Sequence, residues 1–275
     1  MIPEPHRTYV LELWAELGCA SADFVLVGGQ ALKFAVPYAR ATKDFDFILD
    51  VIALRQNPGA VGAALDRLGY IVVPESRNFQ FVKPIPNSVH TMRLELLGPE
   101  EHKRQNDIRV DLGGNVHARA CVGGTIVLAE SDVYEVKGHL PSGVASRAAI
   151  RVSRPHALIF MKCLAMDDRY RNVRGIRHHE HDRDSARVHV ADIVDIMTAQ
   201  ADPMRFREDL IKQFDRDPDL RVRMAQITRE YFTDDASPGL LLYEEYLAAN
   251  ADLGPEQISR DRGRALRLLM TLLFD

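Results

Sequence analysis

The sequence predicts an α/β (α+β) protein, in which a mixed sheet with flanking helices is followed by a C-terminal helical bundle. Two observations indicate this class. Residues 1–154 alternate short apolar runs, which are typical of strands, with segments of helical periodicity. Residues 155–275 carry the helical pattern almost throughout. We therefore expect two domains, an α/β domain over 1–154 and a helical domain over 155–275.

The elements of the first part follow from its apolar residues and its chain breakers. Apolar residues at helical spacing predict the first helix, which Gly18 ends. The run FVLVGG predicts a buried strand that two glycines end. A short Pro/Asn/Ser segment between two later strands predicts a hairpin. We expect helices at 7–18, 30–38 and 58–70, and strands at 24–29, 44–52, 70–76, 79–86, 90–99, 108–114, 123–131 and 148–155.

The second part is predicted to be helical at 156–170, 190–199, 205–232 and 240–275. Between the first two of these, residues 167–189 are polar and hold six Arg and four His, so we expect a charged loop there. Its histidines lack the spaced ligand pairs of zinc sites, which disfavours a zinc site at His178, His179 and His181. A further interpretation is that the loop contacts nucleotide or RNA phosphates through Arg169, Arg171, Arg174 and Arg177.

Composition narrows the class of protein. With 46% hydrophobic and 27% charged residues, the chain is typical of a globular protein. A net charge of −4 excludes a strongly basic nucleic-acid coat. The acidic excess lies in residues 201–275, so a site for a polyanion is expected nearer the N-terminus. Three scattered cysteines indicate no disulfide framework, which favours the cytoplasm, and no apolar run is long enough for a membrane span.

The chemistry is concentrated in residues 25–50. Asp44 and Asp46 are two apart on a predicted strand, so their carboxylates face the same side, about 6 to 7 Å apart along the strand. Two such charges are costly together unless a cation lies between them, and hard oxygen ligands suit Mg²⁺ (or Mn²⁺). Gly28 and Gly29 allow a polyphosphate to approach the backbone, and the helix after them directs N–H groups at that anion.

The order strand, Gly-Gly, helix and Asp-x-Asp resembles the nucleotidyltransferase superfamily typified by DNA polymerase beta. More narrowly, RATKDFDFIL is similar to the R-x-T-x-D-h-D segment (h is apolar) of AbiEii-like (AbiEii/AbiGii) nucleotidyltransferases. These are toxins of toxin–antitoxin and phage-abortive systems, and the MenT tRNA-modifying toxins are their relatives. The match is strongest over 24–50 and extends more loosely to about residue 200. It implies a nucleotidyltransferase fold, with Thr42 and Lys43 at the nucleotide and Arg40 beside them.

The resemblance also implies a third carboxylate on a later, neighbouring strand, so that three carboxylates bind two metal ions. Glu95 in MRLELL and Asp111 in IRVDLGG are the two candidates. The apolar–acid–apolar setting just after a hairpin favours Glu95, and Asp111 stays as the alternative. Aspartate is commoner at this position of the family, so Glu95 is a departure from the pattern.

A second signature of the family lies in the helical part. The pattern P-x-x-L-x-x-x-K-x-x-A matches Pro155, Leu158, Lys162 and Ala165. The acidic motif K-D-x-x-D-I matches ADIVDI, with Ala191 in place of the lysine. By this resemblance, Lys162 binds triphosphate oxygens and Asp192 orients it or assists the site. The alternative is that Lys162 snorkels from an amphipathic helix and Asp192 forms an ordinary ion pair.

The sequence therefore predicts an enzyme that moves a nucleoside monophosphate from an NTP to an acceptor hydroxyl by a two-metal mechanism. The acceptor is a tRNA end, a protein hydroxyl or a small molecule such as an aminoglycoside. The resemblance adds a toxin role, with an antitoxin protein as partner. Two alternatives stay open, a catalytically inactive nucleotide- or partner-binding module of the same fold, and a phosphodiesterase that uses the same carboxylates.

Overall fold

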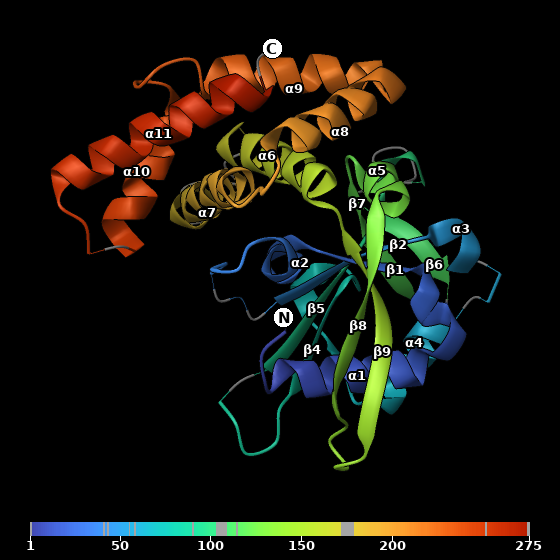
Figure 1. The fold of residues 1–275 in the computed structure, drawn as a ribbon. Coiled ribbons are helices and arrows are strands. Elements are labelled where there is room, and N and C mark those ends of the chain that lie inside the picture. The colour runs from blue at the N-terminus through green and yellow to red at the C-terminus, as the bar shows by residue number, and fades with distance from the viewer. Residues whose placement is uncertain are drawn as a thin grey trace. The chain divides into compact units, whose positions relative to one another are not determined.

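The computed structural model describes residues 2–40, 42, 44–54, 56–57, 59–89, 91–102, 109–113, 115–171, 179–250 and 252–273. The chain divides into two compact units, Met1–Arg154 and Pro155–Asp275 (Figure 1). Within the described residues, the first unit is a mixed sheet with flanking helices and the regular structure of the second is helical. This confirms the predicted fold class.

The sheet of the first unit has a mixed topology. Its strands, within the described ranges, are β1 (Phe24–Val27), β2 (Asp44–Leu49), β3 (Ile71–Val72), β4 (Gln80–Pro84), β5 (Thr91–Pro99), β6 (Arg109–Gly113), β7 (Val116–Cys121), β8 (Ser131–His139) and β9 (Ala145–Ser153). They lie in the order β3-β4-β5-β2-β1-β9-β8, and β7 pairs with β5 and β6. β1 and β2 are antiparallel, whereas β2 and β5 are parallel. The predicted hairpin is confirmed as the antiparallel pair β4 and β5.

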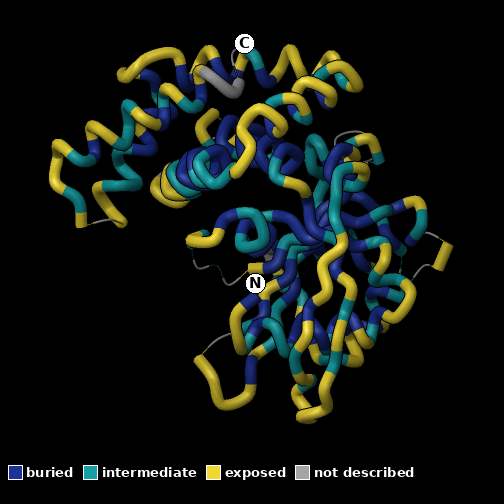
Figure 2. Tube along the Cα trace, in the orientation of Figure 1, coloured by how far each residue is buried: buried dark blue, intermediate teal, exposed yellow. Residues whose placement is uncertain are grey.

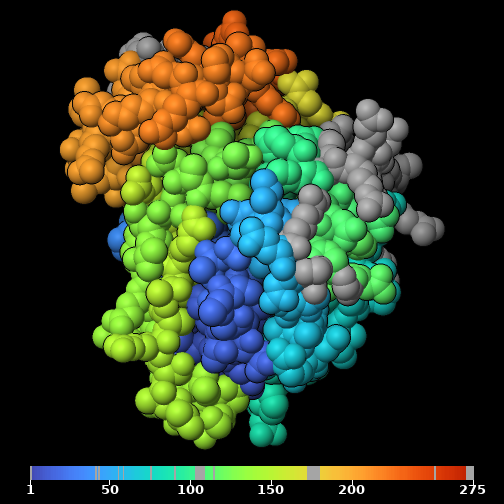
Figure 3. Space-filling view, turned by 90° about the vertical axis from the view of Figure 1, so that its right-hand side faces the viewer, coloured from blue at the N-terminus to red at the C-terminus, as the bar shows by residue number. Residues whose placement is uncertain are grey.

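The helices of the first unit cover the sheet. They are α1 (His6–Leu17), α2 (Gly28–Ala35), α3 (Val51–Leu54), α4 (Ala60–Arg67) and α5 (Gly124–Ala129), with short 3₁₀ turns at Gly18–Asp23, Pro74–Ser76 and Glu100–His102. α1 packs through Trp14, whose ring lies 6.1 Å from Phe24 and 5.2 Å from Phe47. Figure 3 shows this N-terminal segment between the β8–β9 hairpin and the α4 region. Figure 2 shows the buried residues gathered along the central strands.

The second unit contains α6 (Pro155–Arg171), α7 (His179–Thr198), α8 (Pro203–Arg216), α9 (Pro218–Tyr231), α10 (Pro238–Asn250) and α11 (Pro255–Leu273). α8 and α9 begin alike, with an aspartate before a proline. The side chain of Asp202 accepts a hydrogen bond from the backbone N–H of Arg205, and Asp217 does the same for Leu220. Among the described helices, none is long and apolar enough to cross a membrane.

Two predicted elements are wrong. The expected strand at 123–131 is helix α5 followed by the start of β8. An apolar run of this length does not distinguish a strand from a buried helix, and Gly123, in a left-handed conformation at φ +78°, starts the helix instead. The expected loop at 167–189 is also mostly helical, because 167–171 complete α6 and 179–189 begin α7. Residues 172–178 lie outside the described residues.

Candidate active site

The two aspartates of the Asp-x-Asp motif lie on one face of β2. Phe45 and Phe47 alternate with them and are fully buried against the other face, where α1 packs. Asp44 is exposed and Asp46 is half-buried. The alternation of a strand therefore presents both carboxylates on the side opposite the aromatic core, as the sequence predicts.

Gly28 and Gly29 allow the start of α2 to approach Asp46 and Thr42 closely. Gly28 begins α2 with φ +66°, and a Cβ added to it would lie 1.8 Å from Oδ2 of Asp46. A Cβ on Gly29 would lie 2.9 Å from Cγ2 of Thr42. The buried amide Nε2 of Gln30 donates to the carbonyl oxygen of Thr42 over 2.9 Å. The start of α2, the segment before β2 and the Asp46 carboxylate are thus packed together with no room for larger side chains.

The register of the parallel strands places Glu95 beside this pair. Glu95 of β5 is the register partner of Asp46 on the adjacent strand β2, so both side chains lie on the same face of the sheet. Asp111 lies on β6, which in the described sheet pairs with β7, and its Oδ1 accepts a hydrogen bond from the backbone N–H of Gly113 over 2.9 Å. Of the two predicted candidates, Glu95 is therefore the one that the sheet brings next to Asp46.

Both carboxylate oxygens of Glu95 have partners. Nε of Arg119 lies 2.8 Å from Oε1, and Nε2 of Gln80 donates to Oε2 over 2.9 Å. The described residues contain no group of three or more His, Cys, Asp or Glu side chains arranged to hold a metal ion. The chemistry of the donor set fits Mg²⁺, since Asp44 and Asp46 supply two hard carboxylates and Glu95 is the adjacent third. In this arrangement the third is held by Arg119 and Gln80.

The surroundings of Asp44 shift the pKa of its carboxyl in opposite directions. Desolvation raises the pKa of its carboxyl above the ordinary value, and the nearby Glu95 charge adds to this. Arg93, Arg40 and His6 oppose the shift because their positive charge favours the carboxylate. Arg93 is the register partner of Asp44 on β5, so it faces the same side of the sheet. A bound cation would remove the electrostatic cost of ionising this aspartate.

Sequence reasoning missed several of these residues. Arg93 had a signal, because it stands two residues before Glu95 on one strand and shares its face. The remaining ones had none, since their contacts depend on strand pairing or on tertiary packing: these are His6, Gln30, Gln80 and Arg119. Lys43, a predicted nucleotide contact, lies outside the described residues.

Lys162 and Asp192 lie in the second unit and form a buried ion pair. Nζ of Lys162 on α6 donates to Oδ2 of Asp192 on α7 over 2.6 Å, and the two residues are 5% and 0% exposed. The snorkelling interpretation of Lys162 is therefore wrong, because the ammonium lies inside the helical unit. The expected ion pair of Asp192 is present, and its partner is this lysine.

The described arginines of the 167–189 segment pair with acids of their own unit. Arg169 donates to the buried Asp182 over 3.1 Å, and Arg171 pairs with Asp167 and Glu230. These pairs engage two of the four arginines that the sequence assigned to phosphate contacts. Other residues named for that segment lie outside the described ones, namely Arg174, Arg177 and His178.

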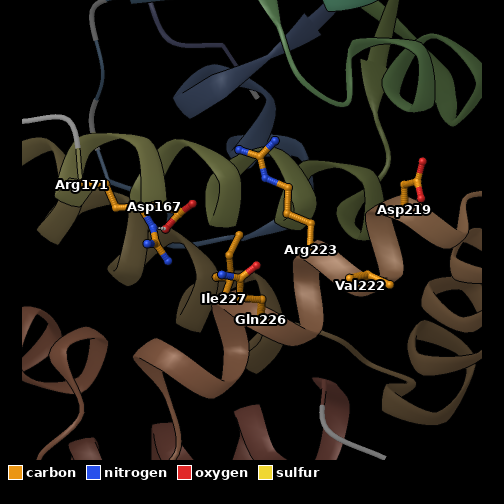
Figure 4. A pocket seen from close by; sticks show the side chains of 7 residues that line it. All are labelled: Asp167, Arg171, Asp219, Val222, Arg223, Gln226 and Ile227. Atoms are coloured by element: carbon orange, nitrogen blue, oxygen red, sulfur yellow. Dashed lines mark hydrogen bonds and ion pairs between the residues drawn. The ribbon is translucent and has the colours of Figure 1, made fainter.

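The second unit also has a surface cavity of about 450 Å³ between α6 and α9. Figure 4 shows Arg171 beside Asp167 in it, with the guanidinium of Arg223 apart from that pair. The hydroxyl of Tyr231 donates to Asp167 over 2.9 Å. The lining residues of the cavity carry equal numbers of acidic and basic groups. They include Arg171, one of the arginines predicted to contact phosphates, but none of the predicted catalytic or metal-binding residues.

No family model matches the chain, and no curated protein matches it. The chain is similar to the solution structure of the antibiotic-resistance factor ANT(2'')-Ia, with a TM-score of 0.31 and 16% sequence identity, over 76% of this chain and 98% of that one.

Proposed function

We propose that the chain is a nucleotidyltransferase that moves a nucleoside monophosphate from an NTP to an acceptor hydroxyl with Mg²⁺ (or Mn²⁺). One observation carries the proposal. Asp44, Asp46 and Glu95 lie on the same face of the adjacent strands β2 and β5, and the Asp46 carboxylate lies against Gly28 at the start of α2. A strand face with three carboxylates beside a helix N-terminus suits a metal-bound triphosphate.

Each of these groups has a part in binding. Asp44 and Asp46 would hold the metal, which supplies an activated acceptor oxygen and stabilises the leaving pyrophosphate. The backbone N–H groups at Gly28 and Gly29 lie at the N-terminus of α2 and would bind phosphate oxygens. Arg93, on the same face as Asp44, places a positive charge where charge develops on the phosphates.

The reaction forms one bond and breaks one. The acceptor oxygen bonds to the α-phosphorus, and the bond from that phosphorus to its bridging oxygen breaks. Pyrophosphate leaves with the electron pair. The hydroxyl proton passes to a carboxylate of the set, for which Glu95 is our choice because it stands next to Asp46 on the neighbouring strand.

We propose that residues 1–154 form the nucleotidyltransferase domain and that 155–275 form a helical C-terminal domain. Lys162 is proposed to neutralise triphosphate charge, with Asp192 orienting it, and their 2.6 Å ion pair supports the orienting part. In this proposal Asp192 keeps the Lys162 ammonium charged and in place.

The acceptor and the toxin role are further proposals. The similarity of the segment around Thr42, Asp44 and Asp46 to AbiEii-like toxins supports an RNA or protein acceptor and an antitoxin partner. The aminoglycoside alternative uses the same site with a small acceptor. Three free cysteines, Cys19, Cys121 and Cys163, support a reducing compartment such as the cytoplasm.

The inactive-module alternative is favoured by one observation, the engagement of both Glu95 oxygens by Arg119 and Gln80.

Calorimetry with Mg²⁺ and a non-hydrolysable NTP analogue tests the site directly. We expect binding by the wild type and loss of binding by Asp46→Asn. Asp66→Asn, an exposed aspartate of α4, is the matched control and should bind normally.

Three outcomes separate the alternatives. Binding that is unchanged in Asp46→Asn contradicts the proposed site. Binding that depends on Asp46, without transfer to any cellular acceptor, favours the inactive module. Cleavage of nucleic acid in the absence of any NTP favours the phosphodiesterase.

A further inference from the structure

Glu95 stands in the middle of a row of polar residues across three strands. Gln80 of β4 and Asp46 of β2 are its register partners on either side. Directly paired residues of neighbouring strands face the same side of a sheet, so the three side chains line up on one face. Nε2 of Gln80 donates a hydrogen bond to Oε2 of Glu95 over 2.9 Å.

Arg119 approaches the same carboxylate from the other direction. It lies on β7 opposite Leu97, which is two residues beyond Glu95 on β5. The guanidinium therefore shares the face of Glu95 and reaches it diagonally, with Nε 2.8 Å from Oε1. The side chains are 37% and 19% exposed, so the pair lies at the rim of the face and not in the core.

We propose that Arg119 is a positioning residue that holds Glu95 away from the metal until a triphosphate arrives. This inference rests on the proposed function. The guanidinium competes with a metal ion for the same carboxylate, because its positive charge lies 2.8 Å from Oε1 of Glu95. Arginine stays charged at all physiological pH values and binds phosphate in the same geometry as carboxylate. When a triphosphate binds beside Asp46, Arg119 exchanges Glu95 for a phosphate oxygen.

The charges on this face agree with such an exchange. Asp44, Asp46 and Glu95 carry three negative charges, and Arg93 and Arg119 carry two positive ones. Two divalent ions bound here without nucleotide would give this face a net positive charge, because the three carboxylates must also balance the two arginines. The triphosphate supplies the missing negative charge, so the complete metal site and the nucleotide assemble together. The side-chain amide of Gln80 keeps its hydrogen bond to Glu95 and so preserves the orientation of the carboxylate throughout.

Titration with Mn²⁺ monitored by electron paramagnetic resonance tests this without a catalytic assay. For the wild type we expect one bound Mn²⁺ without nucleotide and a second only with a non-hydrolysable NTP analogue. Arg119→Gln should bind Mn²⁺ without nucleotide on the order of fivefold more tightly than the wild type, because the competing ion pair is gone. The same variant should bind the analogue about tenfold more weakly, through loss of a charged hydrogen bond.

Controls separate this role from a structural one. Arg119→Lys keeps the charge and should recover part of the analogue affinity. In a Glu95→Gln background, Arg119→Gln should no longer raise Mn²⁺ affinity. Arg67→Gln, which removes the surface pair of Arg67 with Glu16, should leave both affinities unchanged. Thermal unfolding of each variant confirms that it is folded.

The outcomes distinguish the inference from the proposed function. Unchanged or lower Mn²⁺ affinity in folded Arg119→Gln, with binding still dependent on Asp46, overturns the positioning role alone. A wild type that binds neither Mn²⁺ nor the analogue overturns both. Two Mn²⁺ ions on the nucleotide-free wild type contradict the positioning role and leave the proposed function standing.

Discussion

Gly28→Ala is the substitution for which the structure makes the sharpest prediction. Gly28 has φ +66°, a left-handed conformation that disfavours any residue with a Cβ. The added Cβ would lie 1.8 Å from Oδ2 of Asp46, where real Cβ contacts are essentially never under 3.0 Å. The methyl group of alanine therefore strains the backbone and displaces a metal-binding carboxylate at the same time.

The size of the two effects follows from the geometry. The left-handed conformation costs a non-glycine residue roughly 1–2 kcal/mol of folding free energy. The Asp46 carboxylate must move by at least about 1.2 Å to reach a 3.0 Å contact, and a misplacement of about 1 Å costs transfer on the order of 100-fold. We expect a folded protein of reduced stability that has lost nearly all nucleotidyl transfer and Mn²⁺ binding.

Gly69→Ala is the matched control for the backbone effect. Gly69 has φ +75°, and a Cβ there would meet no atom within 4 Å. Both variants should lose a similar free energy of unfolding in denaturant titrations, while only Gly28→Ala should lose Mn²⁺ binding. Wild-type Mn²⁺ binding and transfer by folded Gly28→Ala would refute the reasoning, because the displaced carboxylate would then not belong to the site.

Substitutions at three further places test other parts of the structure. Desolvation raises the pKa of Asp44, so ionisation of this carboxyl destabilises the fold progressively as pH rises above its ordinary pKa of 3.8. In metal-free buffer, Asp44→Asn should therefore raise Tm at pH 7 but not below pH 3.8. An unchanged Tm at pH 7 would contradict this. Lys162→Met or Asp192→Asn alone should cost about 3–5 kcal/mol in denaturant unfolding, and Lys162→Met with Asp192→Leu should recover most of it. Gln30→Leu removes the bond to Thr42 and should cost about 1–3 kcal/mol while weakening analogue binding in calorimetry; equal analogue affinity would count against its role.

The half of the site that lies on β2 could be predicted from the sequence. The alternation of Asp44 and Asp46 with Phe45 and Phe47 specifies both a strand and the face that is buried, because side chains alternate with a period of two. The position of Glu95 beside Asp46 depends on the parallel register of β2 and β5, which no local pattern specifies. Family resemblance, and not periodicity, favoured Glu95 over Asp111.

Other contacts have no local signal. Arg119 lies on β7, a strand whose short run VHARAC has small apolar residues at the buried positions and was not predicted. The 167–189 segment looked like a loop because it is polar, yet it contributes to two helices. Among its described residues, Asp182 is buried and bound by Arg169, whereas Arg183 and Asp184 are exposed on α7. The polarity of the segment therefore reflects a buried ion pair together with the solvent-facing sides of two helices.

Transfer of label from an α-³²P-labelled NTP tests the central claim most directly. The protein would be incubated with each of the four labelled NTPs, Mg²⁺ and total cellular RNA or protein, in parallel with Asp46→Asn and Asp66→Asn. We predict that one NTP labels a discrete acceptor, that Asp66→Asn transfers normally, and that Asp46→Asn or removal of Mg²⁺ abolishes the label. Transfer that survives in Asp46→Asn would contradict the assignment of the β2–β5 carboxylate face as the active site.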